Sequence, residues 1–205
     1  MANTRVITID LNFQNKTQAI ASYLIRQNDA AILIESGPGS TLSALEAGLA
    51  KEGLSPRDIT HVLLTHIHLD HAGAAGWLSR HGAQVFVHPN GAAHMLNPEK
   101  LIASATRIYG DRMDSLWGEF LPVLEHQLTV PQDAEEIAVG NLRFVAVNTP
   151  GHAEHHERGR GQNMEGDAAA RFSLRDDLQQ HRAAQGWSLP RPLSQRPRWC
   201  RQGSA

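Results

Sequence analysis

The sequence contains a single cysteine, Cys200, and therefore no internal disulfide can form. A reducing, cytoplasmic setting is the default expectation for such a chain. No apolar run approaches the ~20 residues that a membrane-spanning helix needs. The N-terminus lacks a basic segment followed by an apolar one, so we expect no signal peptide. Lys and Arg (19) nearly balance Asp and Glu (21), which gives no general attraction for nucleic acid or an anionic membrane.

The 205 residues are enough for one domain with a hydrophobic core. Strands are predicted at residues 5–10, 18–26, 30–34, 61–65, 84–88, 135–139 and 142–147, and helices at 41–52, 72–81 and 98–120. A helix break is expected at Gly110 and a tight turn at Gly140 and Asn141. This order predicts an α/β or α+β protein in which helices cover a sheet, with a meander of strands at its start.

The composition changes after Val147, because no Val, Ile or Tyr follows it. These are the preferred strand residues, so no strand is predicted in residues 157–205. We therefore divide the chain into a domain over residues 1–156 and an atypical tail over residues 157–205. The tail is expected to be disordered, or to result from a reading frame that shifts near residue 157. In the second case the C-terminal part of the fold is incomplete, and translation of the other two frames past codon 156 would reveal the missing strands.

A cluster of metal-binding residue types, His66-x-His68-x-Asp70-His71, directly follows the predicted strand at 61–65. A loop that leaves a strand end is a usual place for a site, because the sheet fixes its position. Zinc binds imidazole nitrogen and carboxylate oxygen. In an extended loop His66 and His68 can point to the same side, since they are two residues apart. The loop can therefore serve two neighbouring metals, with Asp70 and His71 at the second.

A further histidine must complete the first metal site. His152 also follows a predicted strand end, in a tight Pro-Gly turn. His66, His68 and His152 would form a three-histidine site with a fourth position open to water, as in a catalytic zinc site, where the pKa of bound water falls to ~7. The alternative is a chance grouping of histidines in a polar turn.

The motif His-x-His-x-Asp-His after an apolar strand, followed by Thr-Pro-Gly-His at 149–152, resembles the metallo-β-lactamase superfamily over residues 5–156. The tracts LLTHIHLDHAGAAGWL and NTPGHAEHH look like its general metallo-hydrolase branch, which includes glyoxalase II-like thioesterases. The resemblance implies an α+β fold, an αββα sandwich with one or two zinc ions at the sheet edges. It also implies that His66, His68 and His152 bind the first zinc, and Asp70 and His71 the second.

The resemblance further implies a later Gly-Asp, whose aspartate bridges the two metals, and a final histidine. Asp167 follows Gly166 at a spacing from His152 that is slightly short for the family, and no apolar strand precedes it. Asp167 is the candidate bridging ligand, with a solvated loop aspartate as the alternative. His181 is the one histidine left after His156, and its Gln-rich polar surroundings do not fit the final ligand.

The expected function is a zinc-dependent hydrolase, in which metal-bound hydroxide attacks the carbonyl carbon of a small ester, thioester or lactone. Asp70 would hold the second metal and orient the nucleophile, which makes it the catalytic candidate. The expected partner is a small-molecule substrate, without nucleic acid or membrane, and zinc is expected at one or two per chain, although iron or manganese occupy similar sites. One alternative is a phosphodiester or RNA-processing hydrolase. The other is a non-catalytic, truncated chain with an incomplete metal site.

Overall fold

The computed structural model describes residues 4–149 and 169–175. The chain divides into two units, residues 1–174 and 175–205, and Arg175 is the one described residue of the second unit. Helices in the first unit are α1 (Leu42–Lys51), α2 (Leu69–Ala72), α3 (Ala75–Arg80), α4 (Pro89–Leu96), α5 (Glu99–Tyr109) and α6 (Met113–Trp117). No helix among the described residues is long and apolar enough to cross a membrane.

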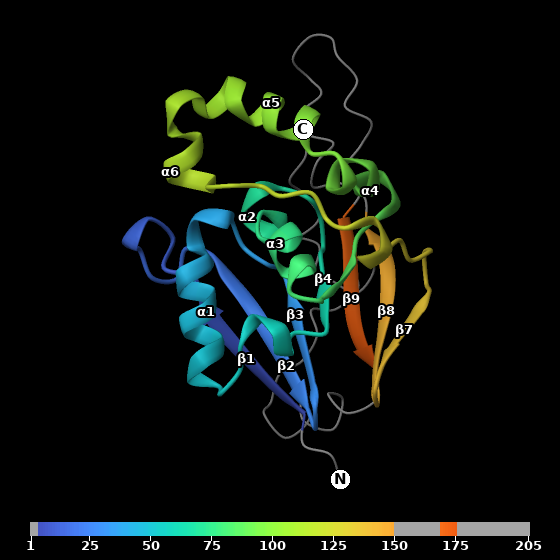
Figure 1. Ribbon diagram of the computed structural model, residues 1–205. Coiled ribbons are helices and arrows are strands. Elements are labelled where there is room, and N and C mark those ends of the chain that lie inside the picture. Colours follow the sequence, from blue (N-terminus) through green and yellow to red (C-terminus); the bar gives the residue numbers. More distant parts are fainter. Residues whose placement is uncertain (1–3, 150–168, 176–205) are drawn as a thin grey trace, which may run out of the picture. The chain divides into compact units, whose positions relative to one another are not determined.

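Six strands form the first sheet, in the order β1 (Arg5–Asp10), β2 (Ala21–Gln27), β3 (Ala30–Ile34), β4 (His61–Leu63), β5 (Gln84–Phe86) and β6 (Leu128–Thr129). The first three strands are antiparallel, which confirms the predicted meander. Strands β3 to β6 are parallel to one another, and Figure 1 shows β3 beside β4. The carboxyl ends of β3, β4 and β5 therefore meet at one edge of this sheet, and the loops that leave it there lie side by side.

A second sheet contains β7 (Glu136–Val139), β8 (Leu142–Thr149) and β9 (Ala169–Arg175). The predicted turn between β7 and β8 is confirmed, and Gly140 has the positive φ of 58° that such a turn requires. Strand β9 corrects the expectation that residues 157–205 contain no strand. The sequence AARFSLR alternates apolar and polar residues, and this period of two indicates a strand even without Val, Ile or Tyr. The rest of that tail lies outside the described residues.

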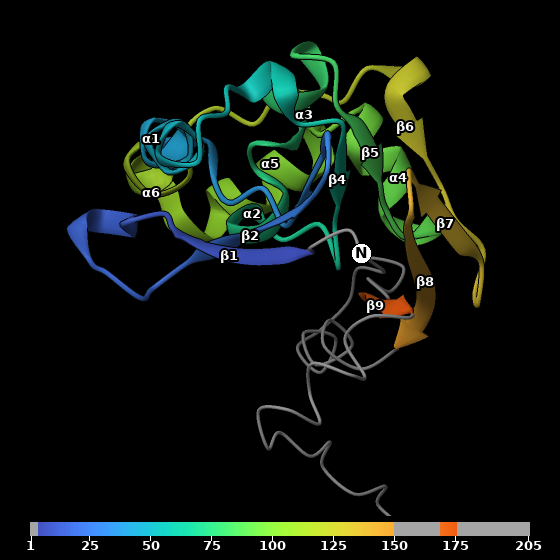
Figure 2. The same ribbon diagram turned by 90° about the horizontal axis from the view of Figure 1, so that it is seen from below.

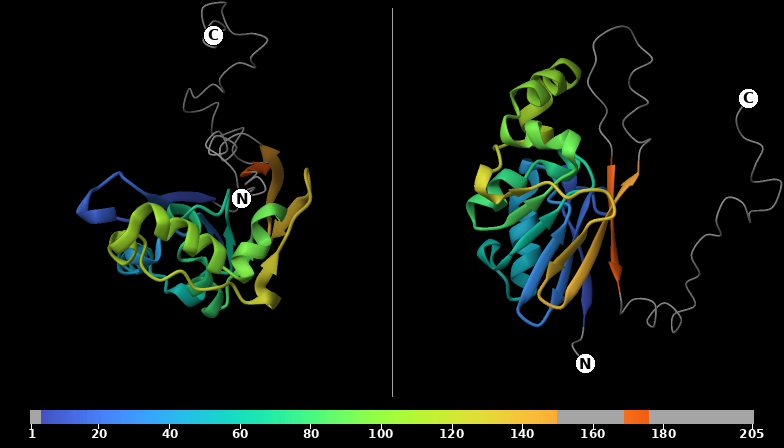
Figure 3. Two further views of the ribbon diagram at one scale, coloured as in Figure 1. Left: turned by 90° about the horizontal axis from the view of Figure 1, so that it is seen from above. Right: turned by 90° about the vertical axis from the view of Figure 1, so that its right-hand side faces the viewer.

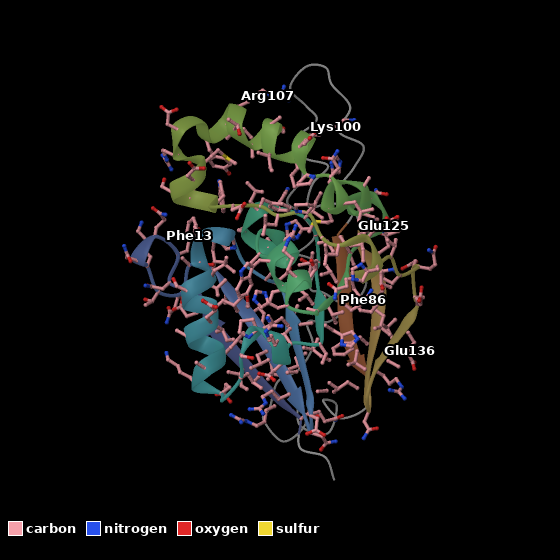
Figure 4. All side chains as sticks on the ribbon, in the orientation of Figure 1. Phe13, Phe86, Lys100, Arg107, Glu125 and Glu136 are labelled. Carbon is pink, nitrogen blue, oxygen red and sulfur yellow. The ribbon has the colours of Figure 1, made fainter. Side chains whose placement is uncertain are left out.

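The two faces of the first sheet pack against different layers. One face contributes Leu24, Leu33, Val62 and Val85 to a core shared with the helices. The other face contributes Ile25, Ile32, Leu63 and Phe86 to a core shared with Ile137 and Phe144 of the second sheet. Phe86 points toward the second sheet (Figure 4), and Figure 2 shows α1 and α3 on the opposite side of the first sheet. Helices, first sheet and second sheet are thus successive layers (Figure 3), as the mixed order of elements predicts.

The predicted helices are present with changed boundaries. The helix expected at 72–81 is divided into α2, which begins inside the histidine motif, and α3. At Gly76 of α3 a Cβ would lie 1.9 Å from the carbonyl oxygen of Leu121, so only glycine permits this close packing. The long helix ends at Tyr109, next to the predicted break. Helix α4 was not predicted; it begins at a proline, and the His88 side chain accepts a hydrogen bond from the backbone N–H of Asn90.

Packing between the sheets should depend on Phe144, which is 1% exposed. We predict that Phe144→Ala lowers the free energy of unfolding by ~3–5 kcal/mol, because a buried ring is replaced by a cavity. Denaturant titration measures the change. Val147→Ala is the control on the same strand, and since Val147 is 38% exposed it should change stability by at most ~0.5 kcal/mol. Equal effects of the two substitutions would contradict the packing of the two sheets against each other.

Candidate metal centre

The predicted site lies where β3 and β4 end. Ile34 and Leu63 are register partners in these parallel strands, so the segments that follow them leave the sheet together. Backbone hydrogen bonds connect the two segments: the N–H groups of Ser36 and Gly37 donate to the carbonyl oxygen of His71, at 2.8 and 3.2 Å. The hydroxyl of Ser36 donates to the same carbonyl at 2.9 Å. These contacts fix the position of the histidine motif relative to the end of β3.

His66 and His68 form the first candidate ligand pair. Nε2 of His66 lies 3.0 Å from Nδ1 of His68, and the ring planes are inclined by 80°. Two nitrogen ligands on one tetrahedral zinc, each bonded at 2.0–2.1 Å, lie about 3.3 Å apart. The observed separation is close to this value, so both ring nitrogens face the same small volume. His66 is buried at 5% exposure, whereas His68 is partly exposed, so the pair is open on one side.

Asp70 and His71 form the second candidate ligand pair. Oδ2 of Asp70 lies 3.2 Å from Nε2 of His71, which is again a separation at which two atoms can share one metal ion. The ring of His71 lies 4.0 Å from that of His66, centroid to centroid, so the two pairs are neighbours. The structure therefore brings together the four residues of the predicted loop as two adjacent pairs, one of two nitrogen atoms and one of an oxygen and a nitrogen atom.

Neither pair is a complete metal site by itself. Within residues 4–149 and 169–175, no group of three or more His, Cys, Asp or Glu side chains is arranged to hold a metal ion. The sequence predicts that His152 completes the first pair and that Asp167 bridges to the second. His152 and Asp167 both lie outside the described residues, as does His181. Their roles stay predictions.

Glu35 also contacts His71 of this loop, although it belongs to none of the sequence motifs. It follows β3 directly, is 6% exposed and has a positive φ of 63°. The hydroxyl of Thr65 donates a hydrogen bond to Oε1 of Glu35, and Thr65 Oγ1 also lies 2.9 Å from Nδ1 of His66. Glu35 stands at the end of a strand that runs parallel to the strand before the histidine motif. An acidic residue at such a place is the sequence signal that could have identified it.

This chain of contacts assigns the protonation of the His66 ring. The single hydroxyl proton of Thr65 is donated to Glu35, so Oγ1 can only accept at the His66 contact. Nδ1 of His66 therefore carries a proton, and when the ring is neutral its lone pair is at Nε2, on the side of His68. A ring held in this way has the orientation and tautomer of a metal ligand, whose second nitrogen donates to an outer group.

Electrostatics of the second pair are governed by two carboxylates. Nδ1 of His71 lies 3.4 Å from Oε1 of Glu35, which is an ion-pair distance. This nitrogen makes no hydrogen bond to any described residue. Burial opposes protonation of the ring, but the contacts with Asp70 and Glu35 outweigh it and raise the pKa of His71 to about 10. Burial also opposes ionisation of Asp70, but the hydrogen bond and charge of His71 hold the pKa of Asp70 below its ordinary value.

Three described histidines outside the motif, His61, His81 and His88, make local contacts. His61 packs against Phe86, with ring centroids 5.7 Å apart, and burial lowers the pKa of its ring. His81 packs against Trp77 at 4.1 Å. His88 accepts a hydrogen bond at 3.2 Å from the backbone N–H of Asn90, in the first turn of α4.

Comparisons with known proteins agree with this architecture. The sequence model of the metallo-β-lactamase superfamily matches residues 16–162. A metallo-β-lactamase fold-containing protein from Sulfurisphaera tokodaii is 29% identical over 103 residues, which cover 48% of this chain and 39% of that protein. Metallo-β-lactamase domain-containing protein 1 from Xenopus laevis is 40% identical over 57 residues, which cover 27% of this chain and 24% of that protein.

Solved structures show the same fold. The MIM-2 metallo-β-lactamase is 27% identical with a TM-score of 0.57, and the match covers 83% of this chain and 53% of the MIM-2 chain. A metallo-β-lactamase family protein from Thermus thermophilus is 24% identical with a TM-score of 0.58, and the match covers 82% of this chain and 55% of that protein. At this identity the similarity is one of fold alone. These matches confirm the α+β sandwich that the motifs predict. This chain spans about half the length of these solved relatives and less of the curated ones.

The raised pKa of His71 predicts how pH changes the stability of the metal-free protein. A group whose pKa rises on folding stabilises the fold fully at pH values below its pKa in the unfolded chain, here about 6.5. That stabilisation is lost as the pH rises through its pKa in the folded protein, here about 10. We expect the difference in free energy of unfolding between wild type and His71→Asn to shrink steadily between pH 6.5 and 10, in urea titrations with a chelator present.

Direct NMR titration of the His71 ring provides the second measurement. The midpoint should lie near pH 10 in the wild type and move toward 6.5 in Glu35→Gln, because one of the two carboxylate contacts is lost. A His71 midpoint near 6.5 in the wild type would show that the two carboxylates do not hold the ring as described.

Proposed function

The chain belongs to the metallo-β-lactamase superfamily, and from this premise we propose that it is a zinc-dependent hydrolase of small esters, thioesters or lactones. Members of this superfamily are generally metal-dependent hydrolases. The observation that carries the proposal is the pair of ligand separations, 3.0 Å between His66 and His68 and 3.2 Å between Asp70 and His71. Imidazole nitrogens and a carboxylate oxygen are ligands that zinc favours.

In this proposal His66, His68 and His152 would hold the first metal, Asp70 and His71 would hold the second, and Asp167 would bridge the two. When bound, zinc would supply an activated nucleophile from water and polarise the substrate carbonyl. Glu35 and Thr65 keep the proton of the His66 ring on Nδ1, so that Nε2 is the nitrogen that can bind metal. Nε2 of His71 must lose its proton before it can bind metal, so affinity at the second pair rises with pH.

Metal content and turnover test the proposal together. Wild-type protein should contain about two zinc ions per chain, measured by mass spectrometry, and should hydrolyse a neutral ester, thioester or lactone. His66→Ala and Asp70→Ala should each lower metal content. Each should also reduce turnover by more than the ~10–100-fold caused by loss of a residue that hydrogen-bonds to a metal ligand. His126→Ala is the matched control, because His126 is exposed and lies outside both pairs.

Three other outcomes decide between the alternatives. Cleavage of a phosphodiester but of no ester, thioester or lactone would identify a phosphodiesterase. Bound zinc without turnover of any of these substrates would identify a non-catalytic chain. Protein that contains no zinc after purification, and takes up none when it is added, would overturn the proposal.

Thr65 tests the role of the outer contacts separately. We predict that Thr65→Val weakens zinc binding by ~10–100-fold, because the His66 ring loses the group that fixes its tautomer and orientation. Competition with a chromophoric chelator measures the affinity. Thr60→Val is the matched control: its hydroxyl bonds to the carbonyl of Ala31 and has no contact with the site. Equal affinities for Thr65→Val and Thr60→Val would exclude the positioning role.

A further inference from the structure

A cavity of about 400 Å³ lies beside the histidine motif, between α2, α5 and α6. Figure 1 shows α5 and α6 above α2. The volume falls within the ~300–1,000 Å³ range of small-molecule pockets. The cavity and the metal motif share Leu69, which stands between His68 and Asp70 in the chain and lines the cavity. A molecule in this cavity is therefore adjacent to the loop that carries the metal ligands.

The cavity wall is mainly apolar and comes from four parts of the chain. Leu69 belongs to α2, Ile102 to α5, and Met113 and Trp117 to α6, while Phe120 follows α6. Leu69 and Phe120 are buried, at 6% and 9% exposure. Burial of apolar surface against such a wall favours binding of an apolar group of a ligand.

The position of Trp117 is fixed by two aromatic contacts. Phe13 stacks on its ring at a centroid distance of 5.5 Å, and Tyr109 packs against its edge at 5.2 Å. Its indole Nε1 is buried and has no hydrogen-bond partner among the described residues. The wall of the cavity is thus preformed, and it contains one indole N–H whose NMR signal is sensitive to a nearby ligand.

The charged residues that line the cavity all have one sign. Asp111, Asp114 and Glu119 lie at its rim and are exposed. No Lys, Arg or His of the described residues lines it. Three carboxylates around one opening produce a negative potential, which favours cationic groups and disfavours anionic ones.

We propose that this cavity binds an apolar acyl or aryl group of the substrate and selects substrates that are neutral or cationic on that side over anionic ones. This inference rests on the proposed hydrolase function and names the substrate class of that same site. The apolar wall supplies the binding surface, the acidic rim supplies the charge preference, and Leu69 connects the cavity to the metal motif.

Binding to the metal-free full chain tests the cavity without any turnover. The probes are three aryl compounds of similar size: benzyltrimethylammonium, benzyl alcohol and benzoate. Indole N–H signals are followed by NMR, and Trp117 is assigned by its loss in Trp117→Phe. We expect the ammonium and the alcohol to shift the Trp117 signal, and benzoate to bind about 10-fold more weakly than the ammonium, because the exposed rim charges are partly screened.

Two sets of variants separate the wall from the rim. Ile102→Phe should weaken all three probes, because the larger ring fills the cavity. Ile108→Phe is its control on the same helix, since Ile108 is 73% exposed and does not line the cavity. Asp111→Asn combined with Asp114→Asn and Glu119→Gln should remove the preference for the ammonium over benzoate and leave benzyl alcohol binding unchanged.

Hydrolysis of matched esters then separates the two proposals. Ile102→Phe should raise KM for a phenylacetyl ester severalfold more than for an acetyl ester of the same alcohol. Hydrolysis with no probe binding at Trp117, or equal binding of benzoate and the ammonium by the wild type, would overturn the cavity inference alone. Probe binding at Trp117 without hydrolysis of any ester would overturn the proposed function, and with it the assignment of the bound group as substrate.

Discussion

The buried carboxylate of Glu35 is the interaction on which the rest of the site depends. A carboxylate at 6% exposure is costly unless hydrogen bonds and opposite charge compensate for lost hydration. Thr65 supplies a hydroxyl donor, and the protonated ring of His71 supplies charge. Both partners come from the segment after β4, and they reach Glu35 only because β3 and β4 are parallel and in register. The register of β3 and β4 therefore also determines the conformation of the turn at Glu35 and the orientation of the His71 ring.

Close backbone packing extends this constraint to the cavity. A Cβ at Gly73 would lie 2.8 Å from Cα of Pro38, and one at Gly39 would lie 2.2 Å from the carbonyl oxygen of Glu119. The turn after Glu35 is thus held between the end of the histidine motif and the segment that follows α6, with no side chain in either contact. A displacement of the cavity wall would press directly on the turn that positions the metal ligands.

Local patterns in the sequence predicted much of this architecture. The strand meander, the turn at Gly140 and the placement of the histidine motif after a strand follow from short-range periodicity and turn chemistry. Glu35 could not be recognised in the same way, because its partners Thr65 and His71 are distant in sequence and meet it only through β3–β4 pairing. For strand β9 the two sequence signals disagree: the lack of Val, Ile and Tyr predicts no strand, whereas the alternation of apolar and polar residues indicates one. Helix α4 begins with a hydrogen bond from the backbone N–H of Asn90 to the His88 side chain, and short-range periodicity does not reveal such a contact.

The charges of the second ligand pair explain how one arrangement suits both the metal-free and a metal-bound protein. Asp70 and Glu35 lie on opposite nitrogens of the His71 ring, and two carboxylates so close to each other repel. A proton on the ring neutralises part of this repulsion, which is why the pKa of His71 rises to about 10. In the proposed function, a metal cation in place of this proton at Nε2 would face the same two carboxylates. The charge arrangement that stabilises the protonated ring would then also favour a bound cation.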